Sequence, residues 1–279
     1  MRLSWQPQAH WVLSGSWSIS VRGSSAGSGA RLGCCRGSRL AGSGRAASSS
    51  ASMAAILLAN IYLHYVLDLW ARQWRQRHAR GDVIIVRYAD DSVVDFRTKV
   101  QAQQFLVQLQ ERLARFGLSL NASKTRLIEF GRFAARNRRK RGLGKPETFD
   151  FLGFTHCCST NRRGGFQVLR LTVKKRMCAT LLAIRDELKR RRHEPIRVQG
   201  QWLTRVVSGY LNYHAVPGNL IRLGGFRSAV CRLWRQALKR RSQRNRLQWS
   251  RFGRLADIYI PKPRIAHPYP WYVGFASRT

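Results

Sequence analysis

Two adjacent carboxylates stand between two runs rich in β-branched residues. The run 81–87 precedes Tyr88-Ala89-Asp90-Asp91, and the run 92–96 follows it. Two short apolar runs joined by a tight turn predict a β-hairpin, with Asp90 and Asp91 at its tip. Hard cations such as Mg²⁺ bind carboxylate oxygens, and phosphoryl transfer needs the metal to neutralise charge on the attacking and leaving oxygens. The hairpin is therefore a candidate site for metal-assisted phosphoryl transfer, with Asp90 as a ligand and Asp91 as a second ligand or an electrostatic helper.

The alternative for this pair is an ordinary solvated turn. Turns favour Asp because its side chain makes local hydrogen bonds to the backbone. The apolar strands expected on both sides favour the functional interpretation, because a half-buried sheet seldom displays acids without a use.

The chain of 279 residues is strongly basic, with 51 Lys and Arg against 13 Asp and Glu and a formal net charge of +38. Acidic residues are absent before Asp68 and again between Glu194 and Asp257. Neutralised phosphates release counterions, so this charge favours a nucleic-acid partner over the alternatives, a solvated basic face or a membrane-surface patch. No apolar run of about 18 residues predicts a transmembrane helix, and basic residues are mixed with Trp and Tyr.

Size and cysteine content limit the class of protein. A hydrophobic content of 44% is enough for a core, in one large or two small domains. The six cysteines include no C-x-x-C spacing, so neither a zinc ribbon nor a disulfide framework is expected. We therefore expect reduced cysteines and a bacterial-type cytoplasmic location, with an organelle as the alternative.

Residues 1–52 are rich in Ser, Gly, Ala and Arg and contain no Lys and no acid. This composition predicts disorder and no packed element. An organellar transit peptide is one interpretation, although no clear amphipathic face is present. The preferred hypothesis is a shifted reading frame or a displaced start, because the composition changes abruptly near Ile56.

The remaining pattern predicts alternating helices and strands. Apolar residues of 54–78 recur at helical spacing, with Leu58, Tyr62, Tyr65 and Leu69 in one stripe, which predicts a helix packed under a sheet. After the hairpin we expect a helix over about 100–116 and a strand over 125–130. The span 132–145 holds seven basic residues and no acid, which predicts an exposed loop.

Further along the chain, strands over 149–154 and 165–171 are expected to form a second hairpin. Helices are expected over about 174–192, 198–213 and 223–240. The prolines of 251–279 predict an extended tail. The fold class is therefore α+β: an antiparallel sheet with helices on one face, followed by an all-α basic region. The expected divisions are 1–52, 53–172, 173–250 and 251–279.

Several segments occur in the order seen in group II intron reverse transcriptases, which this sequence resembles over about residues 56–272. The first part of the resemblance lies in residues 57–63 (LLANIYL), 86–91 (VRYADD), 117–120 with Lys124 and Thr125, and 151–154 (FLGF). Residues 208–214 and 216–219 resemble the maturase region, also called the X domain or thumb. Residues 240–243, 261–265 and 267–270 fit the C-terminal pattern of the family.

The resemblance implies a polymerase palm followed by a helical thumb, and DNA synthesis on an RNA template from deoxynucleotides and a DNA primer. It implies two Mg²⁺ ions, with Asp90 matching one ligand and Asp91 its neighbour. Tyr88 and Ala89 would lie near the primer end, and Lys124 would approach the nucleotide phosphates. Phe151, Leu152 and Gly153 resemble the segment that supports the primer strand, with ordinary core packing as the alternative.

The family carries its other metal-binding aspartate, and the fingers, before the segment 57–60. No Asp occurs there in this sequence. Half of a two-metal site would lose most of the catalysis, so we expect this chain to be inactive by itself. No Cys/His endonuclease block follows the maturase region, so DNA cleavage is not expected.

The alternative function is a non-catalytic RNA-binding maturase that aids splicing of intron RNA. Its helices, over about 174–245, would contact phosphates through basic residues and stack bases on Trp234 and Trp249. The residues expected to contact RNA are Arg138, Arg139, Lys140, Arg141, Arg232, Arg235, Lys239, Arg240, Arg241, Arg244 and Arg246.

Overall fold

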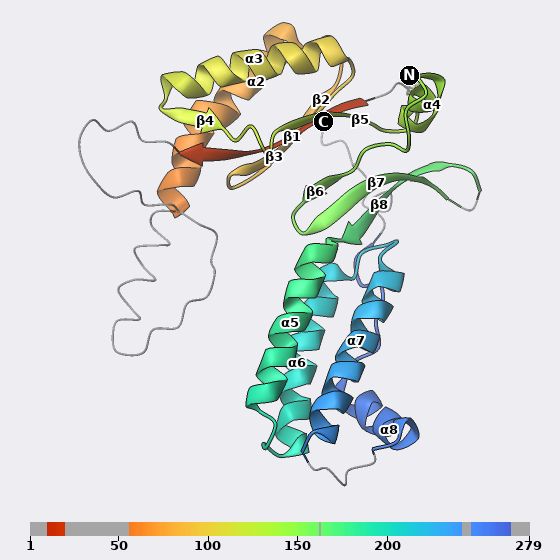
Figure 1. Cartoon of the computed structure of the whole chain (residues 1–279). Helices are drawn as coiled ribbons and strands as arrows, with labels where there is room; N and C mark the ends of the chain where they lie inside the picture. The colour runs from red at the N-terminus through yellow and green to blue at the C-terminus, as the bar shows by residue number, and fades with distance from the viewer. Residues whose placement is uncertain (1–9, 20–55, 162, 242–246, 269–279) are drawn as a thin grey trace. The chain divides into compact units, whose positions relative to one another are not determined.

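The computed structural model describes residues 10–19, 56–161, 163–241 and 247–268. The chain divides into two compact units, Met1–Lys145 and Pro146–Thr279. Both helices and small antiparallel sheets are present, so the structure is mixed α and β (Figure 1). In the part of the chain that the structure describes, no helix is both long and apolar enough to cross a membrane.

The first unit is a five-stranded antiparallel sheet with helices packed on it. Its strands are β1 (His10–Ile19), β2 (Val83–Tyr88), β3 (Asp91–Phe96), β4 (Leu118–Leu120) and β5 (Arg126–Phe130). The strand order is β2-β3-β1, and β4 and β5 pair with successive parts of β1. Since β1 and β2 are both antiparallel to β3, they run parallel to each other, which makes a split β-α-β arrangement.

The helices of this unit are residues 56–63, a π-helical turn η1 (His64–Asp68), α2 (Leu69–His78), α3 (Lys99–Arg115) and α4 (Ala134–Lys140). One hydrophobic core is shared by the helical residues 56–78, α3 and the sheet. Trp74, Phe96 and Phe105 are almost fully buried in it. The ring pairs among these three have centroids 4.9–6.0 Å apart. The predicted hairpin, the helix before it, the helix after it and the strand over 125–130 are confirmed.

The prediction that residues 1–52 contain no packed element is wrong for residues 10–19, because these form β1. Strand β1 pairs with β3 on one side and with β4 and β5 on the other, so its backbone hydrogen bonds are shared with both neighbours. Val12 is buried. The abundance of Ser and Gly concealed a short run with apolar residues at 11, 13, 17 and 19. The rest of this span lies outside the described residues.

The stripe predicted to be buried in the first helix is exposed instead. Leu58 and Tyr65 expose 65% and 64% of their surface, whereas Leu63, Val66 and Leu67 are buried. Apolar residues occupy two faces of this helix, so periodicity alone could not select the face that meets the sheet. The sheet packs against the stripe that continues to Trp74.

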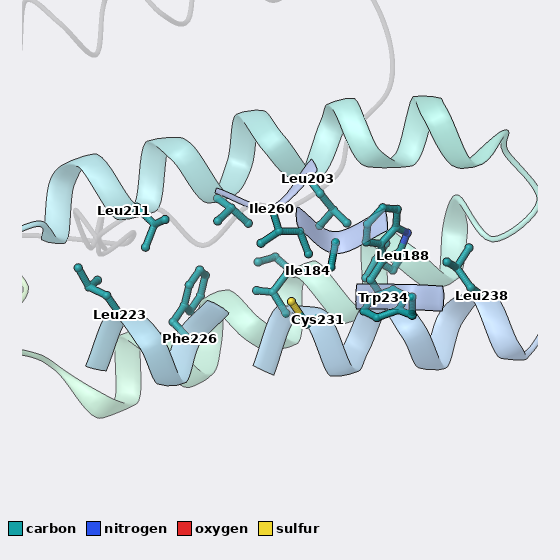
Figure 2. Close-up of a cluster of buried hydrophobic side chains, with 14 residues drawn as sticks. Ile184, Leu188, Leu203, Leu211, Leu223, Phe226, Cys231, Trp234, Leu238 and Ile260 are labelled. Carbon is teal, nitrogen blue, oxygen red and sulfur yellow. The ribbon is translucent and has the colours of Figure 1, made fainter. Parts of the chain in front are cut away.

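The second unit begins with a three-stranded sheet of β6 (Phe149–Phe151), β7 (Phe154–Thr160) and β8 (Phe166–Thr172). Four helices follow: α5 (Lys174–Arg190), α6 (Ile196–His214), α7 (Leu220–Lys239) and α8 (Trp249–Tyr259). Figure 2 shows side chains of α5, α6 and α7 converging with Ile260 into one core. Trp234 is fully buried there, and its indole N–H donates to Gln199 Oε1 at 3.0 Å, so the prediction that it stacks RNA bases is wrong.

Three further predictions need correction. The expected strand over 149–154 is interrupted by a turn at Leu152-Gly153, so β7 is a separate strand and forms the hairpin with β8. The loop expected over 132–145 contains α4, which Glu129 ties to β5. The tail expected to be extended over 251–279 begins inside α8, because its prolines occur only after Ile260. The helices predicted over 174–192, 198–213 and 223–240 are confirmed.

A buried asparagine links the sheet of the second unit to its helices. Asn219 is fully buried, and its Oδ1 accepts from the backbone N–H of Thr172 at 3.0 Å. Its Nδ2 donates to Thr172 Oγ1 at 2.8 Å and to the carbonyl of His214 at 2.9 Å. One side chain therefore joins the end of β8 to the connection between α6 and α7.

We expect Asn219→Leu to lower the free energy of unfolding of the second unit by about 3 kcal/mol, because it leaves buried polar groups unpaired. Urea unfolding of the full chain measures the effect. The control is Asn212→Ala, an exposed position on the neighbouring helix. Equal midpoints for the two variants would contradict the assigned role.

Candidate functional site

The hairpin β2–β3 places the two carboxylates where the sequence predicts them. Tyr88 pairs with Asp91, which closes a two-residue turn at Ala89-Asp90. Ala89 has φ 52, in the left-handed region that non-glycine residues rarely adopt. Asp90 is exposed at the tip, and Asp91 is partly buried as the first residue of β3.

Alternation along the two strands separates the face that packs on the helices from a second face. Val83 on β2 and Val94 and Phe96 on β3 belong to the core with the helices. Asp91 and Asp95 therefore lie on the other face, and their cross-strand partners there are Tyr88 and Ile84. Tyr88 exposes 64% of its surface. On β2 this face is exposed, at Ile84, Val86 and Tyr88, whereas Val12 of β1, which is in register with Asp95, is buried.

Arg87 holds this turn to the first helix. Its Nε and Nη2 donate to Asp68 Oδ1 and Oδ2 at 2.8 and 2.7 Å, a two-bond pairing of guanidinium and carboxylate. Its Nη1 donates to Asn60 Oδ1 at 3.1 Å and to the carbonyl of Ala89 at 3.0 Å. The hydrogen bonds with Asp68 raise the pKa of the Arg87 guanidinium above its ordinary value, against the opposing effect of burial. One charged side chain thus fixes the conformation of the turn that carries Asp90.

The π-helical turn brings Asp68 into position. The backbone N–H of Leu69 donates to the carbonyl of His64, five residues earlier, so the helix gains one residue in this turn. Asp68 is the last residue of the turn. The carbonyl of Val66, inside the turn, accepts a hydrogen bond from Arg112 Nε of α3 at 3.2 Å. Such single π turns often occur at functional sites.

No third metal ligand joins the pair in the described part of the chain. Strand β1 runs beside β3 with Ser16 in register with Asp91, and it contains no acidic residue. Within the described ranges, no three side chains of His, Cys, Asp or Glu gather closely enough to hold a metal ion. The donors found here do not fit a complete two-metal site.

Lys124 lies in the turn between β4 and β5. Asn121 organises this turn: its carbonyl accepts from the backbone N–H groups of Lys124 and Thr125 at 3.0 and 2.9 Å. The side chain of Asn121 accepts from Ser123. Lys124 itself is exposed, and no contact joins it to Asp90.

The segment predicted to support a primer belongs to the second unit and forms a second strained turn. Leu152 and Gly153 both have positive φ, 48 and 81, between the paired residues Phe151 and Phe154. Two positive φ angles identify a type I′ hairpin turn. Leucine is rare at such a position, so neighbouring contacts must hold the turn.

Those contacts come from α6 and from the residue that precedes α5, and neither residue was among the predicted site residues. Tyr213 Oη of α6 donates to the carbonyl of Leu152 at 2.8 Å, and the Val173 N–H donates to the carbonyl of Gly153 at 3.1 Å. A Cβ at Gly153 would lie 3.2 Å from Arg176 Nη1. Tyr213 lies in the maturase-like motif 208–214, and this motif is the sequence signal that could have identified it.

The basic residues of α4 are partly occupied by internal contacts. Arg141 pairs with Glu129, which is buried and also accepts from Asn137 at 2.9 Å. Arg138 donates to the carbonyl of Gly144 at 3.3 Å. Arg139 and Lys140 are exposed.

The basic residues near the end of α7 also fall into two groups, those with internal contacts and those that are exposed. Arg235 donates to the carbonyl of Leu247 at 2.7 Å and lies 4.4 Å from the centre of the Trp249 ring. Arg241 donates to the carbonyl of Glu194. Arg232, Lys239 and Arg240 are exposed, and no ion pair with an acidic residue of the described chain involves them. Arg244 and Arg246 lie outside the described residues.

We expect Arg87→Met to loosen the hairpin. Loss of the bonds to Asp68 and Ala89 should cost about 2 kcal/mol locally, and the amides of residues 83–96 should exchange hydrogen faster. Hydrogen exchange read by mass spectrometry checks this, with Arg72→Met on the exposed side of α2 as the control. Unchanged exchange in Arg87→Met would contradict the proposed contact.

Residues 52–156 match the family model described as "Reverse transcriptase (RNA-dependent DNA polymerase)". A search of curated proteins finds no match. The matched span contains the hairpin, Arg87 and its partners, and it ends in β7, before α5 begins. Residues 52–156 are therefore similar to a reverse transcriptase domain.

Proposed function

We propose that residues 52–156 derive from the palm of a group II intron reverse transcriptase and that the helices after them correspond to its thumb or maturase region. The observation that carries the proposal is the Tyr88–Asp91 turn, held by Arg87 inside the span that matches the reverse transcriptase model. The family match supports RNA-directed DNA polymerase ancestry. The intron type rests on the sequence motifs at 57–63, 151–154 and 208–219.

In this proposal Asp90 and Asp91 are the remaining carboxylates of the polymerase site, and Mg²⁺ is the cation that they would have served. Tyr88 and Ala89 border the primer end, Lys124 approaches nucleotide phosphates, and residues 151–153 support the primer strand. The site is incomplete because β1, the strand in register with Asp91, offers serine and glycine instead of a carboxylate. We therefore propose that the chain by itself does not polymerise.

A primer-extension assay tests this proposal. The purified chain, supplied with Mg²⁺, deoxynucleotides and a DNA primer on an RNA template, should extend the primer no more than its Asp90→Ala variant does. The missing ligand removes most of the electrostatic stabilisation on which phosphoryl transfer depends. Extension that is lost in Asp90→Ala but kept in Asp82→Ala, an exposed acid before β2, would show that the chain is an active polymerase.

A second function, RNA binding without catalysis, is favoured by the charge of the second unit. From residue 220 to residue 259 the chain carries eleven Lys and Arg residues and one acidic residue, Asp257. Arg232, Lys239 and Arg240 point their charge to solvent on this stretch. Exposed basic side chains bind the phosphates of a nucleic acid, because neutralised phosphates release their counterions. We propose that these helices bind folded intron RNA, as a maturase would.

We expect the triple variant Arg232→Gln, Lys239→Gln, Arg240→Gln to bind single-stranded RNA more weakly. The slope of log affinity against log salt should fall by about 2, at about 0.7 per lost phosphate contact. Fluorescence anisotropy over a salt series measures it. The control removes the same charge from α2 through Arg72→Gln, Arg75→Gln and Arg77→Gln.

Equal losses of RNA affinity in the two triple variants would show that binding depends on net charge alone and is not localised on α7. Competition by intron RNA and by scrambled RNA of equal length tests the maturase role separately. Equal competition by both would exclude that role.

A further inference from the structure

A surface groove of about 390 Å³ lies between α7 and α8 in the second unit. This volume falls within the range of small-ligand sites. The groove is lined from α7 by residues that include Arg227, Cys231 and Arg232, and from α8 by residues that include Trp249 and Asp257. The positions of the two helices are labelled in Figure 1.

The floor of the groove is apolar. Phe252 and Ala256 of α8 expose 1% and 4% of their surface, and Cys231 is also buried. Burial raises the pKa of the Cys231 thiol, so the thiol stays neutral and adds no charge to the floor. Such a floor suits a flat, weakly hydrated ring better than a phosphate or a metal ion.

The rim combines an aromatic ring with charges of both signs. Trp249 exposes 52% of its surface while Arg235 lies 4.4 Å from the centre of its ring. Arg232 is exposed on the opposite helix. Asp257, whose side chain is 56% exposed, is held by Arg227 Nη2 at 2.7 Å. It is the one acid of residues 220–259, and its oxygens accept hydrogen bonds from N–H donors.

We infer that this groove binds one unpaired nucleobase of an RNA strand, an inference that rests on the RNA binding proposed above. The ring of the base stacks on Trp249, above the apolar floor of the groove. An exocyclic amino group of the base donates to Asp257, as the cytosine amino group does to carboxylates. Arg232 contacts the adjacent phosphate. Single-stranded RNA is typically recognised in this way, through splayed bases stacked on aromatic or guanidinium groups.

Gly253 provides a substitution that fills the groove without disturbing the core. It lines the groove in the middle of α8, and a Cβ built there meets no atom within 4 Å. Replacing a helical glycine also favours the helix. Gly209 of α6 is the matched control, because it is an exposed helical glycine that likewise faces open space and does not line the groove.

The experiment measures the affinity of the full chain for three RNA probes at one salt concentration: a 12-mer of cytidine, an abasic 12-mer with the same phosphates, and a duplex. The wild type should bind the cytidine 12-mer at least fivefold more tightly than the abasic one, since one stacked base contributes about five- to hundredfold. Gly253→Leu should remove this difference and leave affinity for the abasic and duplex probes unchanged. Gly209→Leu should behave as the wild type.

Three results separate the inference from the function on which it rests. Equal wild-type affinity for cytidine and abasic probes, or a preference that survives in Gly253→Leu, overturns the groove and leaves RNA binding intact. A groove that held a peptide or a lipid headgroup would give the second of these results. Failure of the wild type to bind any probe overturns the proposed RNA binding itself.

Thermal melting followed by circular dichroism checks that Gly253→Leu is folded. If Gly253→Leu is not folded, Asp257→Asn provides the test, because it replaces a single atom of an exposed side chain on the rim of the groove. The wild type should prefer a cytidine 12-mer to a uridine 12-mer, because only cytosine donates an exocyclic amino group to Asp257. The amide of the variant offers an N–H₂ group to the base, so Asp257→Asn should lose this preference. An unchanged preference would overturn the groove.

Discussion

The bond between Arg87 and Asp68 is the contact on which the candidate site of the first unit depends. It joins a helix to a hairpin turn that is unfavourable by itself, because Ala89 adopts a positive φ that costs about 1 kcal/mol or more. Asp68 reaches Arg87 from the end of a π-helical turn, and Arg87 then holds the carbonyl of Ala89. The position of Asp90 therefore depends on a contact between two residues that both lie outside the Ala89-Asp90 turn.

The second unit also contains a hairpin turn with a positive φ, and different residues stabilise it. Leu152 also adopts a positive φ in a two-residue turn, and the Tyr213 hydroxyl and the Val173 N–H bind the two carbonyls of that turn. Asn219 supplies a second link between the same sheet and the helices. In both units hydrogen bonds from side chains or backbone groups outside the two-residue turn therefore stabilise its strained conformation, and in both units these groups are linked to a packed helix.

The excess of arginine serves two physical purposes. Arg87, Arg235 and Arg241 donate to carbonyls or carboxylates within their own unit, so much of their hydrogen-bonding capacity is used by the fold. Arg232, Lys239 and Arg240 are exposed. Among these six residues, the second group leaves its charge open to solvent. Composition predicts the partner, but the number of basic residues overstates the number of contacts.

Much of the fold could be predicted from the sequence. The hairpin with Asp90 at its tip and the helices α3, α5, α6 and α7 follow from periodicity and turn chemistry, which act between near neighbours. The buried face of the first helix could not be predicted, since apolar residues occupy two of its faces. Nor could β1, whose hydrogen bonds come from strands more than 70 residues away.

By itself, therefore, the sequence determined the charge, the likeness of residues 52–156 to a reverse transcriptase and the position of the two carboxylates in a turn. Only the tertiary structure decided what holds that turn and which basic side chains remain exposed. It also decided that a strand without acids lies beside Asp91. The physical reason is distance along the chain: Arg87 and Asp68 are 19 residues apart, and Tyr213 and Leu152 are 61 apart. Local propensity carries no information about such partners, which meet only when the cores form.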